Sequence, residues 1–178
     1  MLLTAQLKDM QKNHFLHWNG AVASDFLLLS VSGQETISTP FCYELRSVTA
    51  LDEEGIAALH GKTVSCQIGD GLHNRPRRYL HGVVTHIQRG RDANDQAVCT
   101  FRLEPAFALL KSGRSTRVWQ NIAVPDLVRK LLSEHQISQV SLQLRNTYQK
   151  REYCIQYRES DFDFISRLLE EEGIGYFF

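Results

Sequence analysis

Hydrophobic and polar positions alternate most clearly in the last quarter of the chain. A run with a period of two predicts a half-buried β-strand, and its apolar members are Tyr153, Ile155 and Tyr157. A run at helical spacing follows at once, and its apolar members are Phe162, Ile165, Leu168 and Leu169. These four side chains form one stripe along a helix, which predicts that the helix packs on a sheet.

This predicted helix has a start signal and a stop signal. Ser160 can accept a hydrogen bond from an N–H of the first turn, and Asp163 completes a short capping box three residues later. Gly173 ends the helix in the left-handed conformation that glycine tolerates. Residues 174–178 then begin another predicted strand.

The first 112 residues read as short strands with little helix among them. The predicted strands cover residues 14–19, 26–31, 41–45, 63–68, 79–89 and 97–103. The last two form a hairpin through residues 92–95, and a short helical turn is predicted over residues 52–59. Six or seven strands at this spacing predict a small antiparallel β-barrel that is closed or nearly closed.

After Pro105 the pattern changes to helices alternating with strands. A short helix over residues 106–111 precedes a linker-like stretch, a brief strand over 117–120 and a second helix with Pro125 in its first turn. Residues 140–144 alternate as a further strand, which we expect to pair with residues 153–157 across a turn at 146–147. This pattern predicts helices packed against a small sheet.

The whole chain is therefore predicted to be an α+β protein with two domains. Residues 1–112 form a hub-like β-barrel, and residues 113–178 form the beginning of an α/β two-layer domain. The last predicted strand stops at Tyr176, Phe177 and Phe178 without a turn or a polar cap. We therefore expect this chain to be the N-terminal portion of a longer protein, truncated within its second domain.

The composition is that of an ordinary soluble globular protein, with 43% hydrophobic and 22% charged residues. The 20 lysines and arginines balance the 20 aspartates and glutamates, so no global field favours nucleic acid or an anionic membrane. No apolar run near the N-terminus is long enough for a signal peptide or a spanning helix. The 4 cysteines lie far apart without a CxxC pattern, which favours buried free thiols in a reducing compartment over disulfides.

No convergent set of reactive groups is visible in the sequence. His14 and His17 lie on opposite sides of a predicted strand, so they cannot share a metal ion. The pair Gly61 and Lys62 lacks the upstream glycine of a phosphate-binding loop, and no nucleophile elbow is present. We therefore predict no catalytic residue, no metal site and no cofactor.

Two charged clusters are candidate interfaces. Arg75, Arg77 and Arg78 form a basic cluster in a predicted loop beside Tyr79, where they could contact a protein or, as the alternative interpretation, a nucleic acid. The second cluster consists of Glu170, Glu171 and Glu172. It lies at the C-terminal end of the predicted helix, where the helix dipole disfavours negative charge. A solvated helix end is the plain interpretation, and an external cationic partner is the functional one.

A long and chemically varied segment at the end of the chain resembles a known family. It reads Tyr157-Arg-Glu-Ser-Asp-Phe-Asp-Phe-Ile-Ser-Arg-Leu-Leu-Glu-Glu-Glu-Gly-Ile-Gly-Tyr-Phe-Phe178. This segment is similar to the signature segment of the VgrG spike proteins of type VI secretion and of the related late-control and baseplate hub proteins of contractile phage tails. Residues 32–45 resemble the first hairpin of that family, and residues 59–64 resemble the start of its next strand.

The resemblance implies a structural function without catalysis. In that family three copies assemble around a threefold axis, and the hub section caps the hexameric Hcp tube and passes the thrust of sheath contraction to the puncturing tip. We accordingly expect a homotrimer in the full-length protein, with an Hcp-like tube and baseplate components as partners. The resemblance also implies a cytoplasmic location before firing and secretion without a signal peptide afterwards.

Two other functions stay open at this stage. A small barrel with a basic loop could be a nucleic-acid-binding module, which would be retained on DNA or RNA in a salt-dependent way. The chain could also be the carrier portion of an effector with an enzymatic domain further downstream.

Overall fold

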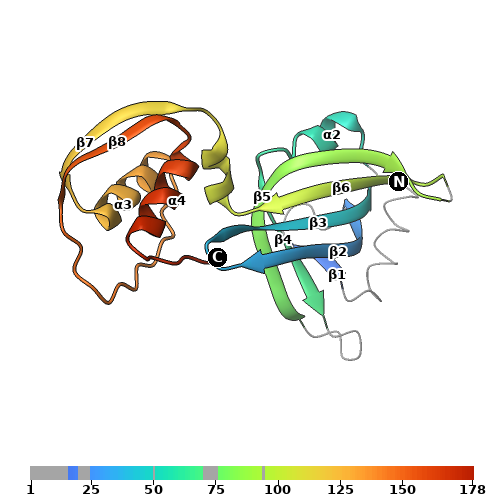
Figure 1. Ribbon diagram of the computed structural model, residues 1–178. Coiled ribbons are helices and arrows are strands. Elements are labelled where there is room, and N and C mark those ends of the chain that lie inside the picture. Colours follow the sequence, from blue (N-terminus) through green and yellow to red (C-terminus); the bar gives the residue numbers. More distant parts are fainter. Residues whose placement is uncertain (1–15, 20–24, 50, 70–75, 94) are drawn as a thin grey trace. The chain divides into compact units, whose positions relative to one another are not determined.

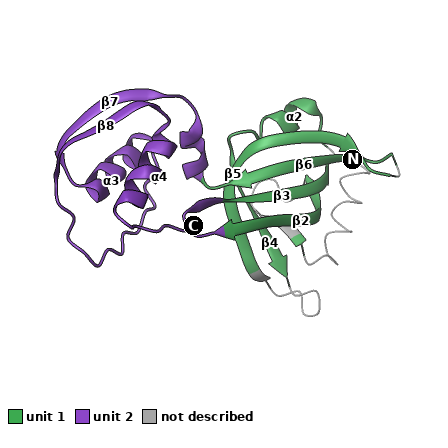
Figure 2. Ribbon diagram, viewed as in Figure 1, with its two compact units in different colours: residues 1–35, 41–105 green, residues 36–40, 106–178 purple. Residues whose placement is uncertain are grey.

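The computed structural model describes residues 16–19, 25–49, 51–69, 76–93 and 95–178. The chain divides into two compact units (Figure 2). Unit 1 consists of residues 1–35 and 41–105, and unit 2 consists of residues 36–40 and 106–178. Among the described residues, no helix combines the length and the apolarity needed to cross a membrane.

Unit 1 is built on a six-stranded sheet that curls (Figure 1). Its strands are β1 (Leu16–Asn19), β2 (Phe26–Thr36), β3 (Thr39–Thr49), β4 (Thr63–Gly69), β5 (Pro76–Arg91) and β6 (Ala97–Glu104). The strand order is β1-β4-β5-β6-β3-β2, with antiparallel pairing of β1 with β4, β4 with β5, β5 with β6 and β3 with β6. The predicted antiparallel β unit is confirmed. Because β1 and β2 lie at the two edges of the sheet, closure into a barrel stays a prediction.

An aromatic cluster fills the concave side of this sheet. The rings of Trp18 on β1, Phe26 on β2 and Phe101 on β6 lie 5.3 to 5.8 Å apart, and all three side chains are buried. The indole Nε1 of Trp18 donates a hydrogen bond to Ser47 Oγ at 2.8 Å, which satisfies the one polar atom of that ring. Side chains of the two edge strands therefore meet in the core of unit 1.

The predicted hairpin of β5 and β6 is confirmed, with Arg91 opposite Ala97. A β-bulge interrupts its register between Val84 and His86. The short predicted helical turn is also present as α2 (Glu53–Ala57), where the carboxylate of Asp52 accepts a hydrogen bond from the N–H of Gly55 at 2.9 Å.

Unit 2 packs helices on one side of a two-stranded ribbon (Figure 1). Its elements are a 3₁₀ helix η2 (Ala106–Lys111), β7 (Ser115–Ile122), α3 (Val124–Glu134), β8 (Arg151–Glu159) and α4 (Asp161–Glu171). The strands β7 and β8 pair antiparallel. The core between ribbon and helices holds Leu127, Leu131, Phe164, Ile165 and Leu168, each at most 1% exposed.

The predicted boundaries of α4 are confirmed at both ends. Ser160 Oγ accepts a hydrogen bond from Asp163 N at 3.0 Å and lies 2.7 Å from Asp163 Oδ2. At the other end Gly173 has a φ of 66°, and the N–H of Ile174 donates to the carbonyl of Leu169 at 2.8 Å. This six-to-one bond is the Schellman arrangement that a left-handed glycine permits.

Two predicted strands are wrong. Residues 140–144 form no strand, and β8 pairs with β7, so no hairpin turn exists at residues 146–147. The strand β7 has eight residues, so it can form backbone hydrogen bonds with β8 along most of the length of β8. The segment 140–144, with three apolar residues, is too short to pair with β8 over the same length. Residues 174–178 also form no strand, although the carbonyl of Tyr176 accepts one hydrogen bond from the N–H of Ser38 at 2.8 Å.

Candidate interaction surfaces

The described residues contain no group of three or more His, Cys, Asp and Glu side chains that could hold a metal ion. His14 lies outside the described residues, and the structure describes only the backbone of His17. All four cysteines are free thiols. Burial raises the pKa of the Cys66 thiol to about 11, so this thiol stays protonated near neutral pH.

The basic cluster is only partly visible. Arg75 lies outside the described residues, and Arg77 lies in β5 with its side chain undescribed. Arg78 also lies in β5 and not in a loop. Its guanidinium donates to the carboxylate of Glu35 and lies 5.9 Å from the ring centroid of Tyr43.

Glu35 receives a second hydrogen bond from the Tyr43 hydroxyl at 2.8 Å. The hydrogen bonds from Arg78 and Tyr43 lower the pKa of the Glu35 carboxyl. Arg78 is thus anchored across β2, β3 and β5 on the surface of unit 1, with its side chain 49% exposed. The role of the three arginines as an interface stays a prediction.

The acidic end of α4 has cationic partners within the chain. Arg151, at the start of β8, donates to Glu171 and to Glu172, both at 2.6 Å. Arg167 donates to Glu171 at 3.0 Å and to Glu159 at 2.8 Å. The hydrogen bonds from Arg151 and Arg167 outweigh desolvation and lower the pKa of the Glu171 carboxyl.

The negative charge at the C-terminal end of α4 suggested an external cationic partner. Arg151 and Arg167 of the same chain supply the cationic groups. The sequence did not reveal Arg151 as the partner because it lies about twenty residues before the glutamates and on another element. Glu170 is exposed on the same helix end. An interface role for Glu170, Glu171 and Glu172 stays a prediction.

A buried polar network surrounds Asp161 in the first turn of α4. This carboxylate is 7% exposed, and it accepts a hydrogen bond from Gln156 Nε2 at 2.6 Å. The ring Nε2 of His135 lies 2.6 Å from Asp161 Oδ2, and Arg117 Nη2 donates to the same oxygen at 3.3 Å. These contacts of Asp161 were not predicted from the sequence, because Gln156, His135 and Arg117 lie on three other elements or element ends.

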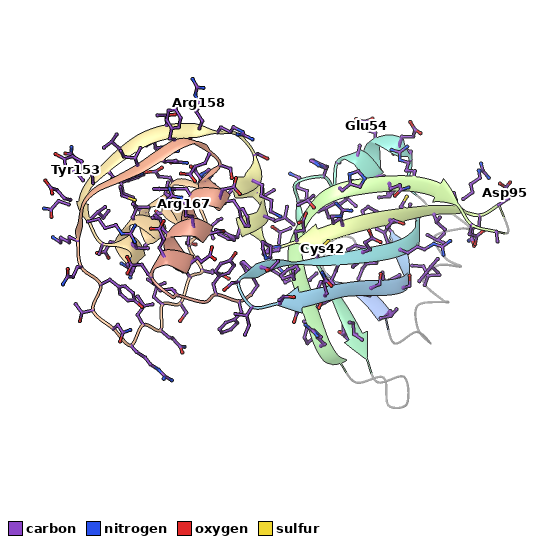
Figure 3. The ribbon with its side chains drawn as sticks, viewed as in Figure 1. Cys42, Glu54, Asp95, Tyr153, Arg158 and Arg167 are labelled. Carbon is purple, nitrogen blue, oxygen red and sulfur yellow. The ribbon has the colours of Figure 1, made fainter. Side chains whose placement is uncertain are left out.

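The β7–β8 ribbon also has an exposed apolar surface that was not predicted from the sequence. We call it the outer face, and its apolar members are Val118 (59% exposed), Tyr153 (59%), Ile155 (55%) and Tyr157 (63%). Val118 pairs directly with Ile155 in the ladder. Figure 3 shows Tyr153 and Arg158 pointing away from the helices.

The opposite side of β8 faces the helices through Cys154 and Gln156, which are both buried. The predicted strand therefore exists, but its aromatic side is the uncovered one. Alternation in a sequence defines two faces of a strand without saying which face the rest of the chain covers.

The surfaces described above display guanidinium, carboxylate and aromatic groups. Of these, aromatic side chains and arginine are enriched in contacts between proteins.

Comparison with known proteins finds relatives of this chain among phage tail and type VI secretion proteins. The model of a family described as the phage tail baseplate hub (GPD) matches residues 34–178. The type VI secretion system spike protein VgrG1b of Pseudomonas aeruginosa is 32% identical over 169 residues, which cover 94% of this chain and 22% of the relative. VgrG1c of the same organism is 34% identical over 169 residues, which cover 94% of this chain and 23% of the relative.

A solved structure agrees with these relatives. The E. coli c3393 protein, described as a component of the type VI secretion system with structural similarity to the T4 bacteriophage tail proteins gp27 and gp5, superposes with a TM-score of 0.72. It is 32% identical, and the match covers 89% of this chain and 43% of that chain. The chain thus spans about a quarter of the length of the curated relatives it matches and less than half of the solved one.

Proposed function

The chain belongs to the phage tail baseplate hub family, and from this premise we propose that it is the hub part of a trimeric type VI secretion spike. In this function the hub caps a hexameric Hcp-like tube and transmits the thrust of contraction to the puncturing tip. The observation that carries the proposal is the family match, which covers most of unit 1's sheet and all of α3, β8 and α4.

The proposed role is mechanical and has no catalytic step. A hub that passes force between a tube and a tip needs surfaces held rigidly by packed cores, because a loosely packed element would yield under load. The buried aromatic cluster of Trp18, Phe26 and Phe101 supports such rigidity in unit 1. In unit 2, the ion pairs of Arg151 and Arg167 tie β8 to α4.

The domain plan is part of the same proposal. Residues 1–112 would form a hub-like barrel, with the Trp18 and Phe26 side chains joining its edge strands, and residues 113–178 would begin an α/β domain. The change of unit between residues 105 and 106 supports a boundary in this region.

The partners in the proposal are two further copies of the protein, a hexameric Hcp-like tube and baseplate components. The protein would stay in the cytoplasm until firing and leave the cell through the machine.

Binding to the tube protein tests this function. The complete product of the gene that encodes this chain is mixed with the purified Hcp-type protein of the same genome, and native mass spectrometry measures the complex. The proposal predicts three copies of the product on one hexameric ring. Failure to bind under conditions in which both proteins are folded would contradict it, and salt-dependent retention on DNA or RNA would favour a nucleic-acid-binding module instead.

A further inference from the structure

We propose that the outer face of the β7–β8 ribbon docks a protein partner that presents apolar side chains beside carboxylates. The inference goes beyond the proposed function and does not rest on it, because it is carried by the surface chemistry of unit 2 alone. It assigns a contact to a surface that lies on neither of the two charged clusters seen in the sequence.

The first observation is the apolar character of the uncovered face. An antiparallel sheet that packs helices on one side normally presents polar residues to water on the other. Here Val118, Tyr153, Ile155 and Tyr157 are all more than half exposed on that side. A continuous apolar patch on a strand pair is a signature of a contact surface.

The second observation is the geometry of the patch. Tyr153, Ile155 and Tyr157 alternate along β8, so they form a row about 13 Å long. Val118 lies directly opposite Ile155 and fills the centre of the face with a second aliphatic side chain. Tyrosines bury a large area at a low cost in side-chain entropy, which makes such a row suited to a protein contact.

The third observation is a cationic end to this row. Arg158 has no partner residue on β7, because Ser115 pairs with Glu159 and Thr116 pairs with Tyr157. Its backbone has a φ of 51°, and its guanidinium lies 5.4 Å from the ring centroid of Tyr157. Arg114 Nη1 donates to the carbonyl oxygen of Arg158 at 3.2 Å. A left-handed backbone at a non-glycine residue costs free energy, and such strain collects at sites with a function.

The charge pattern indicates what the partner supplies. Three other arginines of unit 2 each contact two carboxylates of the chain, and they are Arg117, Arg151 and Arg167. Among the described residues, neither Arg114 nor Arg158 has a carboxylate within ion-pair distance. A partner with carboxylates at this end of the row would therefore complement the two guanidinium groups.

The aliphatic centre favours a protein over a single-stranded nucleic acid. Bases stack on aromatic rings, and the pair of Val118 and Ile155 separates the two tyrosines that could provide such stacking. The chain also has no net positive charge to attract a phosphate backbone. The inference therefore commits to an acidic and apolar protein surface.

Photo-crosslinking tests the inference. The photoreactive amino acid p-benzoylphenylalanine replaces Ile155 in the protein expressed in its source cells, and the crosslinked peptides are mapped by mass spectrometry. Replacement of Val140, an exposed apolar residue of unit 2 that lies outside the ribbon, is the positional control. The proposal predicts one discrete protein adduct at residue 155 that is absent at residue 140, mapping to a segment with apolar residues beside aspartate or glutamate.

The charge contribution is measured on the mapped segment. A synthetic peptide of that segment is titrated against the chain and against the double variant Arg114→Glu/Arg158→Glu. We expect the variant to weaken binding about tenfold or more, whereas Arg129→Glu on α3 has no such effect. Circular dichroism verifies that each variant is folded. A second test is Ile155→Thr, which keeps a β-branched residue at an exposed position and should also weaken binding.

Several results would overturn the inference. They are the absence of a discrete adduct at residue 155, an adduct on a basic segment, an adduct on a second copy of this chain, and an adduct on nucleic acid. Equal affinity of the double variant and the parent chain for the mapped peptide would also overturn it. None of these results would change the expected binding of the complete protein to the tube, so the two proposals can fail separately.

Discussion

At the residue scale, the side chain of Asp161 joins four parts of unit 2. It contacts Gln156 from β8, Arg117 from β7 and His135 from the end of α3, and it lies in the first turn of α4. Its position at the positive end of the helix dipole stabilises the charged form further. A buried carboxylate with this many donors holds the surrounding elements in register.

Replacing this carboxylate by an amide should destabilise unit 2. We expect Asp161→Asn to lower the free energy of opening of α4 by about 2 kcal/mol, because charge-assisted hydrogen bonds are lost at a buried position. Native-state hydrogen exchange of the α4 amides measures this free energy. Asp126→Asn is the matched control, since Asp126 makes an exposed ion pair with Arg129 and should cost less than about 0.5 kcal/mol. Equal effects of the two substitutions would contradict the role assigned to Asp161.

The same carboxylate should make the stability of unit 2 depend on pH. Burial alone would raise the pKa of Asp161, but the hydrogen bonds from Gln156 and His135 and the charge of Arg117 outweigh it and lower this pKa. A carboxyl whose pKa is lower in the folded state adds stability above its unfolded pKa of about 3.9, and this stability is lost as the pH falls through the folded value. Urea midpoints measured from about pH 6 down to about pH 3 should fall less steeply for Asp161→Asn than for the parent chain.

At the element scale, the sequence predicts correctly those elements whose ends are fixed by neighbouring residues. The capping residues Ser160 and Asp163 and the stop at Gly173 lie within α4 or next to it, so the sequence was sufficient to place this helix. The pairing of β7 with β8 joins segments about forty residues apart, and no local signal specifies it. Burial of Gln156 instead of Tyr157 depends on a hydrogen bond to Asp161, which only the folded arrangement reveals.

A glycine in β5 illustrates a constraint between neighbouring strands. A Cβ atom added at Gly82 would lie 2.6 Å from the carbonyl oxygen of Glu104 on β6, whereas one added at Gly90 on the same strand meets nothing within 4 Å. We therefore expect Gly82→Ala to destabilise unit 1 by about 2 kcal/mol through displacement of β6. Gly90→Ala should change the stability by less than about 0.5 kcal/mol. Urea denaturation of both variants measures the difference, and comparable losses would refute the close approach at Gly82.

At the scale of the whole molecule, the two units carry different candidate surfaces. Unit 1 has Arg77 and Arg78 near the start of β5, and unit 2 has the acidic end of α4 and the outer face of the ribbon. The sequence located the charged clusters because runs of like charge are visible without a fold. It could not locate the outer face, because exposure depends on which side of β8 the helices cover.

Charge reversal tests the arginine cluster within the proposed spike. The triple variant Arg75→Glu/Arg77→Glu/Arg78→Glu of the complete gene product should bind the Hcp-type protein at least about tenfold more weakly, because opposed charges at an interface become like charges. Binding is measured by titration with the purified tube protein. Arg78→Glu also removes the contact with Glu35, so circular dichroism must show that the variant is folded.

The matched control carries the same change of net charge elsewhere on unit 1. It replaces Arg89, Arg91 and Arg102, which make exposed ion pairs, by glutamate. Weakened binding in both triple variants would indicate a general charge effect, and unchanged binding in the first would rule out the arginine cluster as the tube contact.

The mass of the complete gene product in solution shows directly whether the protein forms a trimer. Light scattering coupled to size-exclusion chromatography gives this mass without a partner or a label. If the protein is part of a trimeric type VI secretion spike, the measured mass is three times that of one complete chain. A folded product with the mass of a single chain would contradict it.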